Sequence, residues 1–196
     1  MKFRIQLLLL SIWAVLLLPV TAMSQGLLYN NGPIVTHPGS GSGGADVSQM
    51  QGVTLGYGTI GYGANNNGPI RLTDQFTNTV PWVIDYIDVY AYQTGSTTTS
   101  TFTSGVIKIW DNDPSLGSAN TEFGDFSTNR MVLTDWTNCY RTVEADMSAT
   151  NRPIMRIRLN CGGVVIPAGT HWVEYGLTVL LHPDHSVRMS VFWEPV

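Results

Sequence analysis

Residues 70–77 read IRLTDQFT, and apolar side chains alternate with polar ones along most of this stretch. In an extended chain Ile70, Leu72 and Phe76 lie on one face, and the polar residues between them lie on the other. A period of two is typical of a β-strand with one face in a core and one in water. The stretch therefore predicts a half-buried strand, in which Asp74 interrupts the apolar face.

Several later stretches also predict strands. Residues 83–92 (VIDYIDVYAY) and 105–110 (GVIKIW) are mainly β-branched and aromatic, and we expect both to be central strands covered on two faces. Segments of similar character follow at 140–146, 154–160, 170–180 and 187–193. About eight to ten short strands, separated by Gly, Pro and Asn turns, predict an all-β fold: an antiparallel β-sandwich similar to a jelly roll.

Residues 1–24 have the features of a secretory signal peptide. Lys2 and Arg4 precede an apolar run at 7–18, and small residues follow it. The alternative is an uncleaved membrane helix, but the run is shorter than the roughly 20 residues that span a bilayer. We therefore expect a secreted or cell-surface protein, with residues 25–196 as a single domain and no membrane association after cleavage.

Composition excludes several classes of protein. Only 12% of the 196 residues are charged, which argues against a coiled coil and a charged disordered tail. Loss of the signal would leave 8 of the 10 basic residues against 14 acidic ones, a formal net charge of −6. Such a surface repels phosphate backbones, so we expect no nucleic-acid partner.

Two cysteines in an exported protein are expected to pair, here Cys139 with Cys161. A hairpin turn centred on Thr150 would place these cysteines opposite each other. The same register forms one ion pair and one apolar pair on opposite faces of the ribbon: Glu144 with Arg156, and Val143 with Ile157. The alternative is two free, buried thiols.

An acidic segment resembles part of a calcium-binding loop. Counting from Asp111, oxygen ligands fall at the expected positions with Asp113, Ser115 and Glu122. However, Leu116 stands where the loop needs glycine, and the segment follows a predicted strand. An ordinary acidic turn is therefore the favoured interpretation, with calcium as the alternative and no other cofactor expected.

The sequence contains no clear catalytic motif. No serine lies in a Gly-x-Ser-x-Gly frame, and the segment at 182–185 (HPDH) is better explained as a turn than as a metal site. A serine-histidine triad or a carboxylate pair would have to assemble in space, from His37, His171, His182 and His185 or from Asp85, Asp88 and Glu174. We therefore expect no enzymatic activity, and a hydrolase on a jelly-roll scaffold is the last alternative.

Aromatic residues favour a different function. Five tryptophans follow the signal: Trp82, Trp110, Trp136, Trp172 and Trp193. Flat aromatic faces suit sugar rings, so a carbohydrate-binding module is the main alternative. Trp136 lies in the turn-rich segment 134–138 (TDWTN) and is, with Tyr140, the candidate glycan contact.

Residues 28–39 (LYNNGPIVTHPG), 43–46 (GGAD) and 71–76 (RLTDQF) resemble the start of a β-sandwich module common in secreted bacterial proteins. Later segments at 91–96, 152–155 and 167–172 are similar to the same group, so the resemblance covers nearly all of the mature chain. Such modules often precede C-terminal sorting or surface-anchor signals. The resemblance implies no particular activity and no catalytic residues. It favours a non-catalytic secreted or surface module with a structural or adhesive role and a glycan or cell-surface component as partner.

Two differences from that group have consequences. Its members are not known for a cysteine pair, so the predicted disulfide depends on the register argument alone. They usually continue beyond the region that matches residues 192–196 with further strands and an anchor. This difference leaves two expectations: a fragment of a longer anchored protein or a minimal secreted version. If strands are missing, an exposed sheet edge would favour self-association.

Overall fold

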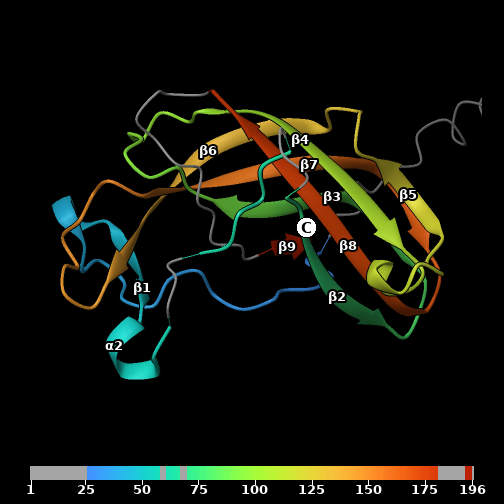
Figure 1. Cartoon of the computed structure of the whole chain (residues 1–196), viewed down its shortest axis with the longest axis horizontal. Helices are drawn as coiled ribbons and strands as arrows, with labels where there is room; N and C mark the ends of the chain where they lie inside the picture. Colours follow the sequence, from blue (N-terminus) through green and yellow to red (C-terminus); the bar gives the residue numbers. More distant parts are fainter. Residues whose placement is uncertain (1–25, 58–60, 67–69, 181–192, 196) are drawn as a thin grey trace, which may run out of the picture.

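The computed structural model describes residues 26–57, 61–66, 70–180 and 193–195. The predicted signal peptide lies outside this part of the chain, as do His182 and His185. The described residues form two β-sheets and only single turns of helix (Figure 1). This architecture confirms the predicted all-β sandwich.

The first sheet has the spatial order β1-β6-β7-β3-β9, and the second has the order β2-β8-β4-β5. Their bounds are β1 (Asp46–Met50), β6 (Met131–Val143), β7 (Pro153–Ile166), β3 (Trp82–Ala91) and β9 (Trp193–Pro195), then β2 (Leu72–Asn78), β8 (Gly169–Val179), β4 (Phe102–Trp110) and β5 (Thr121–Asp125). Neighbouring strands are antiparallel except β1 and β6, which are parallel.

The helical elements are η1 (Ser42–Gly44), α2 (Gly52–Leu55) and η2 (Pro114–Leu116). Within the described residues, no helix has the length and apolar character needed to cross a membrane.

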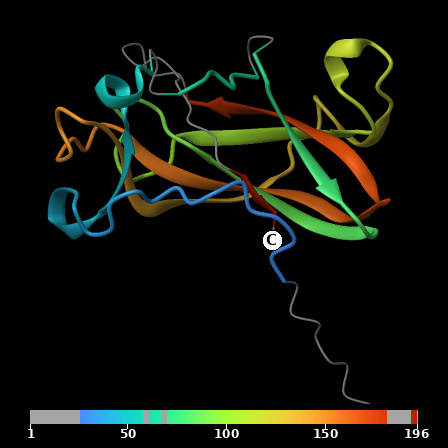
Figure 2. The ribbon, with the colours of Figure 1, turned by 90° about the horizontal axis from the view of Figure 1, so that it is seen from below.

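Along the strands, alternate side chains point into the core between the two sheets. In β8, Val173, Tyr175 and Leu177 point inward and are buried. Figure 2 shows the two sheets as stacked layers. Gly105 of β4 lies so close to Leu159 of β7 that an added Cβ would collide with that leucine side chain. The absence of a side chain at Gly105 thus allows the sheets to approach closely.

The outer face of the five-stranded sheet carries a second, small core. Tyr90 of β3 packs there with Cys139 and Ile154, and Ile34 and Val35 of the N-terminal segment cover them. Figure 2 shows this segment, in blue, running along the sheet. The prediction that β3 is covered on two faces is therefore confirmed for its second half.

The same prediction is wrong for β4. Its residues Lys108 and Trp110 point away from the core and are only half-buried. Strand β4 lies in the four-stranded sheet, and these two residues are on the face of that sheet that points away from the other sheet.

Strands β6 and β7 form the predicted hairpin, but the predicted register is wrong. Asp135 lies opposite Arg156, and Thr134 lies opposite Ile157. Two hydrogen bonds join the Arg156 guanidinium to the Asp135 carboxylate, at 3.1 and 2.8 Å. The acidic partner of Arg156 is thus Asp135 in place of the predicted Glu144.

The shift arises from the turn and from a bulge. The chain turns at Asp146, whose Oδ1 accepts hydrogen bonds from the backbone N–H and the hydroxyl of Ser148 at 3.0 and 2.8 Å. Such an Asx turn ends the strand earlier than the predicted turn at Thr150. Asn138, with φ 58°, lies within a second register shift between Trp136 and Tyr140.

The predicted disulfide is wrong for the same reason, because Cys139 and Cys161 are both free and buried. With Tyr140 opposite Pro153, Cys139 lies beside Ile154, seven residues along β7 from Cys161. At about 3.3 Å per residue this is roughly 23 Å, whereas a disulfide needs Cα atoms within about 7 Å. Burial raises the pKa of both thiols to about 12, so both are neutral packing groups at pH 7.

Candidate functional site

The outer face of the four-stranded sheet gathers aromatic and charged side chains. Along β8, Trp172 and Glu174 point outward, because they alternate with the buried core residues of that strand. The strand register places Lys108 of β4 opposite Glu174, and Trp110 opposite Trp172. Thr73 of β2 lies opposite Glu174 on the other side. Side chains from three neighbouring strands therefore meet around Glu174.

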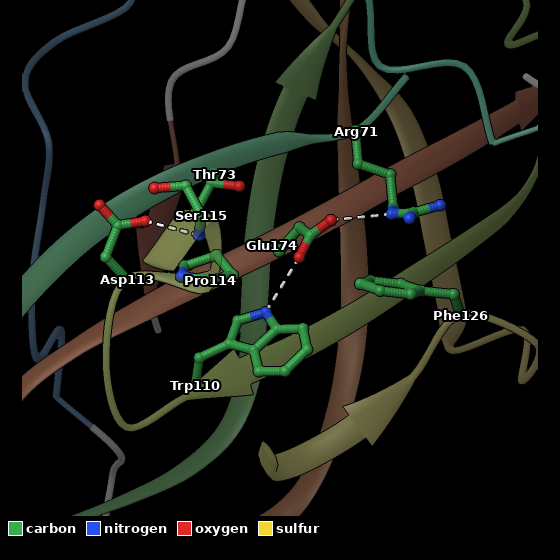
Figure 3. Close-up of a pocket in the computed structure, with 8 residues that line it drawn as sticks. All are labelled: Arg71, Thr73, Trp110, Asp113, Pro114, Ser115, Phe126 and Glu174. Carbon is green, nitrogen blue, oxygen red and sulfur yellow. Dashed lines mark hydrogen bonds and ion pairs between the residues drawn. The ribbon is translucent and has the colours of Figure 1, made fainter. Parts of the chain in front are cut away.

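Glu174 is held by two hydrogen bonds, which Figure 3 shows. Arg71 Nε donates to Glu174 Oε1 at 2.8 Å, and Trp110 Nε1 donates to Glu174 Oε2 at 3.0 Å. The carboxylate side chain is 14% exposed, so the ion pair with Arg71 is partly shielded from water. Each carboxylate oxygen has more than one acceptor position, so Glu174 can also accept a hydrogen bond from a ligand.

Two cations lie over aromatic rings in the same site. The guanidinium carbon of Arg71 is 3.9 Å from the ring centre of Phe126, and Lys108 Nζ is 4.1 Å from that of Trp110. The Trp110 and Phe126 ring centres are 6.4 Å apart, and the rings are inclined by 50°. These cation–π contacts restrain the two rings, which lie beside the Glu174 carboxylate.

The loop between β4 and β5 closes one side of the site. Asp113 precedes η2 and accepts a hydrogen bond from the backbone N–H of Ser115 at 2.8 Å. Hydrogen bonding by Ser115 lowers the pKa of the Asp113 carboxyl. Pro114 begins the helical turn, where its restricted φ is favourable. In Figure 3, Pro114 and Ser115 lie on the side of Glu174 that faces away from Phe126.

Together these elements enclose an open cavity of about 470 Å³. It is lined by Arg71, Thr73, Trp110, Asp113, Pro114, Ser115, Phe126 and Glu174. Arg71 and the adjacent Lys108 balance the charges of Asp113 and Glu174. Apolar surfaces beside a few well-placed donors and acceptors are typical of a site for a small polar ligand.

The residues predicted as the calcium alternative bind three different partners. Asp111 accepts hydrogen bonds from the backbone and side-chain amides of Asn120, at 2.6 and 2.8 Å. Asp113 caps η2, and a Glu122 oxygen lies 2.6 Å from His171 Nδ1. Among the residues that the structure describes, no group of three His, Cys, Asp or Glu side chains is placed to hold a metal ion.

The predicted glycan contact Trp136 lies on the other sheet. The segment 134–138 belongs to strand β6 and is not the turn that its composition predicted. Trp136 lines a smaller cavity of about 370 Å³ beside Asp135 and Arg156, and its Nε1 donates to the Cys139 carbonyl at 3.3 Å. Tyr140 is buried, with its ring centre 5.3 Å from that of Trp136, and is not one of the lining residues.

The other catalytic candidates are kept apart. Asp85 and Asp88 lie on β3 in the five-stranded sheet, whereas Glu174 lies on β8 in the other sheet. Asp88 is buried and accepts two hydrogen bonds from Arg158, each at 2.7 Å. Glu174 thus does not pair with either carboxylate of β3.

The two described histidines have local roles. His37 Nδ1 is 2.9 Å from the hydroxyl of its neighbour Thr36. His171 is buried, with Nδ1 2.6 Å from Glu122 and Nε2 3.0 Å from the Pro167 carbonyl oxygen. Both ring nitrogens of His171 therefore face protein acceptors, and neither is available to activate a nucleophile.

Sequence reasoning named Trp110 and Glu174 but did not connect them, and it missed Arg71, Lys108 and Phe126 as site residues. One signal was available: in 172–176 (WVEYG) and 108–110 (KIW), large polar or amphipathic residues alternate with core residues. Arg71 precedes β2 and Phe126 follows β5, so no strand pattern pointed to either residue.

No family model, curated protein or solved structure matches this chain.

Proposed function

We propose that this chain is a non-catalytic, extracellular β-sandwich module that binds a neutral glycan on the outer face of its four-stranded sheet. The observation that carries the proposal is the Glu174 carboxylate, held by Arg71 and Trp110 within an open cavity with aromatic walls. A sugar ring presents apolar C–H surfaces together with hydroxyl groups. The cavity offers rings for the first and charged or hydroxyl groups for the second.

The charge balance of the cavity supports a neutral ligand. Arg71 and Lys108 supply two positive charges, and Asp113 and Glu174 supply two negative ones. An anion that approaches the cations also meets the carboxylates, and the reverse holds for a cation. Hydroxyl groups can donate to the carboxylates and accept from Arg71 without adding charge.

The two carboxylates of the cavity support binding over hydrolysis. A glycosidase needs one carboxylic acid that stays protonated near neutral pH and a second carboxylate across the scissile bond. Hydrogen bonding lowers the pKa of Asp113, which favours its ionised form. Glu174 accepts hydrogen bonds from Arg71 and Trp110, so each of its oxygens is already held by a protein donor.

Secretion is part of the proposal, and the pattern of residues 1–24 supports it. A sandwich displayed outside the cell, with a glycan site on one open face, accounts for an adhesive or structural role. The partner is then a glycan of a cell surface or matrix.

A glycan array tests the proposal with the mature protein and two tryptophan variants. We expect the unmodified protein to bind neutral saccharides, and Trp110→Ala to weaken that binding about tenfold or more, or about 1.4 kcal/mol. Trp136→Ala is the matched control on the other sheet and should retain binding. Circular dichroism verifies that both variants fold.

Three outcomes would count against the proposal. Loss of binding in Trp136→Ala with retention in Trp110→Ala would move the site to the five-stranded sheet. Absence of neutral-glycan binding by the unmodified protein, or release of reducing sugar from the bound glycans, would overturn the function itself.

A further inference from the structure

Strand β1 and helix α2 lie at one end of the sandwich (Figure 1). Residues of both elements line a third cavity. Its volume is about 430 Å³, and its wall comes from strands β1 and β6 and from the segments that precede and follow β1. The residues that matter for binding are Gln49, Gln51, Leu55, Tyr57, Tyr62 and Arg141. The Trp110 cavity shares none of these residues.

Arg141 is a buried cation in the wall of this cavity. Only 6% of it is exposed, its Nη1 donates to the Ser48 hydroxyl at 2.8 Å, and its Nη2 lies 3.7 Å from the Met50 sulfur. Burial lowers the pKa of its guanidinium. A guanidinium carries five N–H donors in a planar fork, so it can hold a carboxylate in addition to its partners in the protein.

The two tyrosines come from the repeated Gly-Tyr-Gly sequences at 56–58 and 61–63. Tyr57 and Tyr62 line the same cavity, although they are 56% and 68% exposed. Leu55, beside them, is also exposed. Large exposed aromatic and aliphatic side chains around a buried charge are unfavourable in water and typical of a binding surface. The repeat thus places two tyrosines at this cavity, and neither lines the Trp110 cavity.

The surrounding charges favour an anion. Arg141 is the one charged side chain among the described residues that line the cavity. Two acidic residues lie near the cavity, and both are held by backbone N–H groups: Asp46 of β1 accepts from Gly39 at 2.8 Å, and Glu144, which follows β6, accepts from Val53 of α2 at 2.7 Å. The amide side chains of Gln49 and Gln51 add neutral donors and acceptors.

We propose that this cavity binds an acidic sugar residue, with Arg141 holding its carboxylate and Tyr57 and Tyr62 contacting its ring. The Arg141 fork matches a carboxylate in shape and charge. The exposed tyrosine rings match the apolar face of a pyranose, and the two glutamine amides match its hydroxyls. This site is independent of the neutral-glycan site, because the two lie on different elements and differ in net charge.

Isothermal titration calorimetry tests the proposal. The mature protein is titrated with an oligogalacturonate and, separately, with the neutral galactose oligomer of equal length. We expect the acidic oligomer to bind at this site with at least about tenfold higher affinity than the neutral one. Tyr62→Ala should weaken acidic binding about tenfold, and it should fold because Tyr62 is exposed. Arg141→Lys keeps the charge but loses the fork, and should weaken acidic binding while neutral-glycan binding through Trp110 is unchanged.

Trp110→Ala is the control and should leave acidic binding unchanged. Equal affinity for the acidic and neutral oligomers, or full acidic binding by Tyr62→Ala, would overturn the proposal. Inorganic phosphate and a short peptide with a free C-terminal carboxylate form the comparison arms. Tighter binding of either than of the oligogalacturonate would show that the ligand is not an acidic sugar. If the mature protein binds the acidic oligomer but no neutral glycan, the proposed function at the Trp110 site is overturned and the acidic-sugar site is not.

Discussion

Glu174 Oε2 accepts a hydrogen bond from the indole N–H of Trp110 at 3.0 Å, and Glu174 Oε1 accepts one from Arg71 Nε at 2.8 Å. Glu174 lies on β8, Trp110 ends β4, and Arg71 directly precedes β2. One carboxylate therefore positions a side chain of β4 and a side chain just before β2, the two strands that flank β8. The geometry of the proposed glycan site depends on this one residue.

Replacement of Glu174 tests that dependence. Glu174→Ala leaves the Trp110 N–H and the Arg71 guanidinium without this acceptor, and should lower the free energy of unfolding by about 1 to 3 kcal/mol. Glu174→Gln retains an acceptor but no charge, and should cost less. Urea denaturation measures both variants, and a neutral-oligosaccharide titration should show weaker binding for each. Wild-type stability and affinity in Glu174→Ala would contradict the assigned role.

The close approach of β5 to β4 depends on Gly124, which pairs with Lys108. The φ of Gly124 is +79°, and an added Cβ would collide with the Ile107 carbonyl of β4. We expect Gly124→Ala to lower the free energy of unfolding by about 3 kcal/mol. Gly117→Ala is the matched control, because Gly117 also has a positive φ (+69°) but open space around it, and should cost about 1 kcal/mol. If thermal or urea unfolding shows that both variants lose the same free energy of unfolding, the close contact between β4 and β5 does not add to the cost of Gly124→Ala.

The free, buried state of Cys139 and Cys161 predicts their reactivity. Both thiols have a pKa raised to about 12 by burial, so neither forms a thiolate at pH 8 in the folded protein. Ellman's reagent should react with two thiols per chain in denaturant without reductant, and only slowly before unfolding. The pKa of each thiol is about 12 in the folded protein and about 9 in the unfolded chain. The two buried thiols therefore stabilise the fold fully below pH 9, and this stabilisation is lost as pH rises toward 12. No reactive thiol after unfolding would instead restore the disulfide.

Acid should weaken the turn that precedes β6 through Asp125. Hydrogen bonds from the Ser127 hydroxyl, and from the backbone N–H groups of Thr128 and Ser127, lower the pKa of the Asp125 carboxyl. A lowered pKa stabilises the fold above the unfolded-state pKa of about 4, and this stabilisation is lost as pH falls below it. Unfolding of the wild type and Asp125→Asn at several pH values should show a difference that is largest at pH 7 and shrinks in acid. A pH-independent difference would be inconsistent with this assignment.

Most strands were predictable because their residues alternate or are β-branched. The expected ranges 83–92 and 170–180 differ by one residue at each end from β3 (Trp82–Ala91) and β8 (Gly169–Val179). The first part of β6 was missed, because the segment TDWTN has turn-forming residues that the structure accommodates at the Asn138 bulge. Local composition does not reveal such a bulge, since it depends on pairing with β7.

The β6–β7 register was beyond local reasoning because Arg156 had two acidic partners to choose from. Asp135 and Glu144 each give a chemically reasonable pair, and the Asx turn at Asp146 selects the first. The candidate site was hidden for a related reason. A run such as GVIKIW does not reveal whether Lys108 and Trp110 face a second layer or water, which depends on the position of β4 in the sandwich.

The most direct test of the proposed function is the indole N–H spectrum of the ¹⁵N-labelled protein during titration with a neutral oligosaccharide. The indole N–H of Trp110 lies at the centre of the candidate site, whereas that of Trp136 donates to the Cys139 carbonyl on the other sheet. We predict that the Trp110 resonance, assigned with Trp110→Phe, shifts in a saturable manner and that the Trp136 resonance does not move. Saturable binding that shifts Trp136 and leaves Trp110 unchanged, or no shift of Trp110 with any neutral glycan, would contradict this assignment.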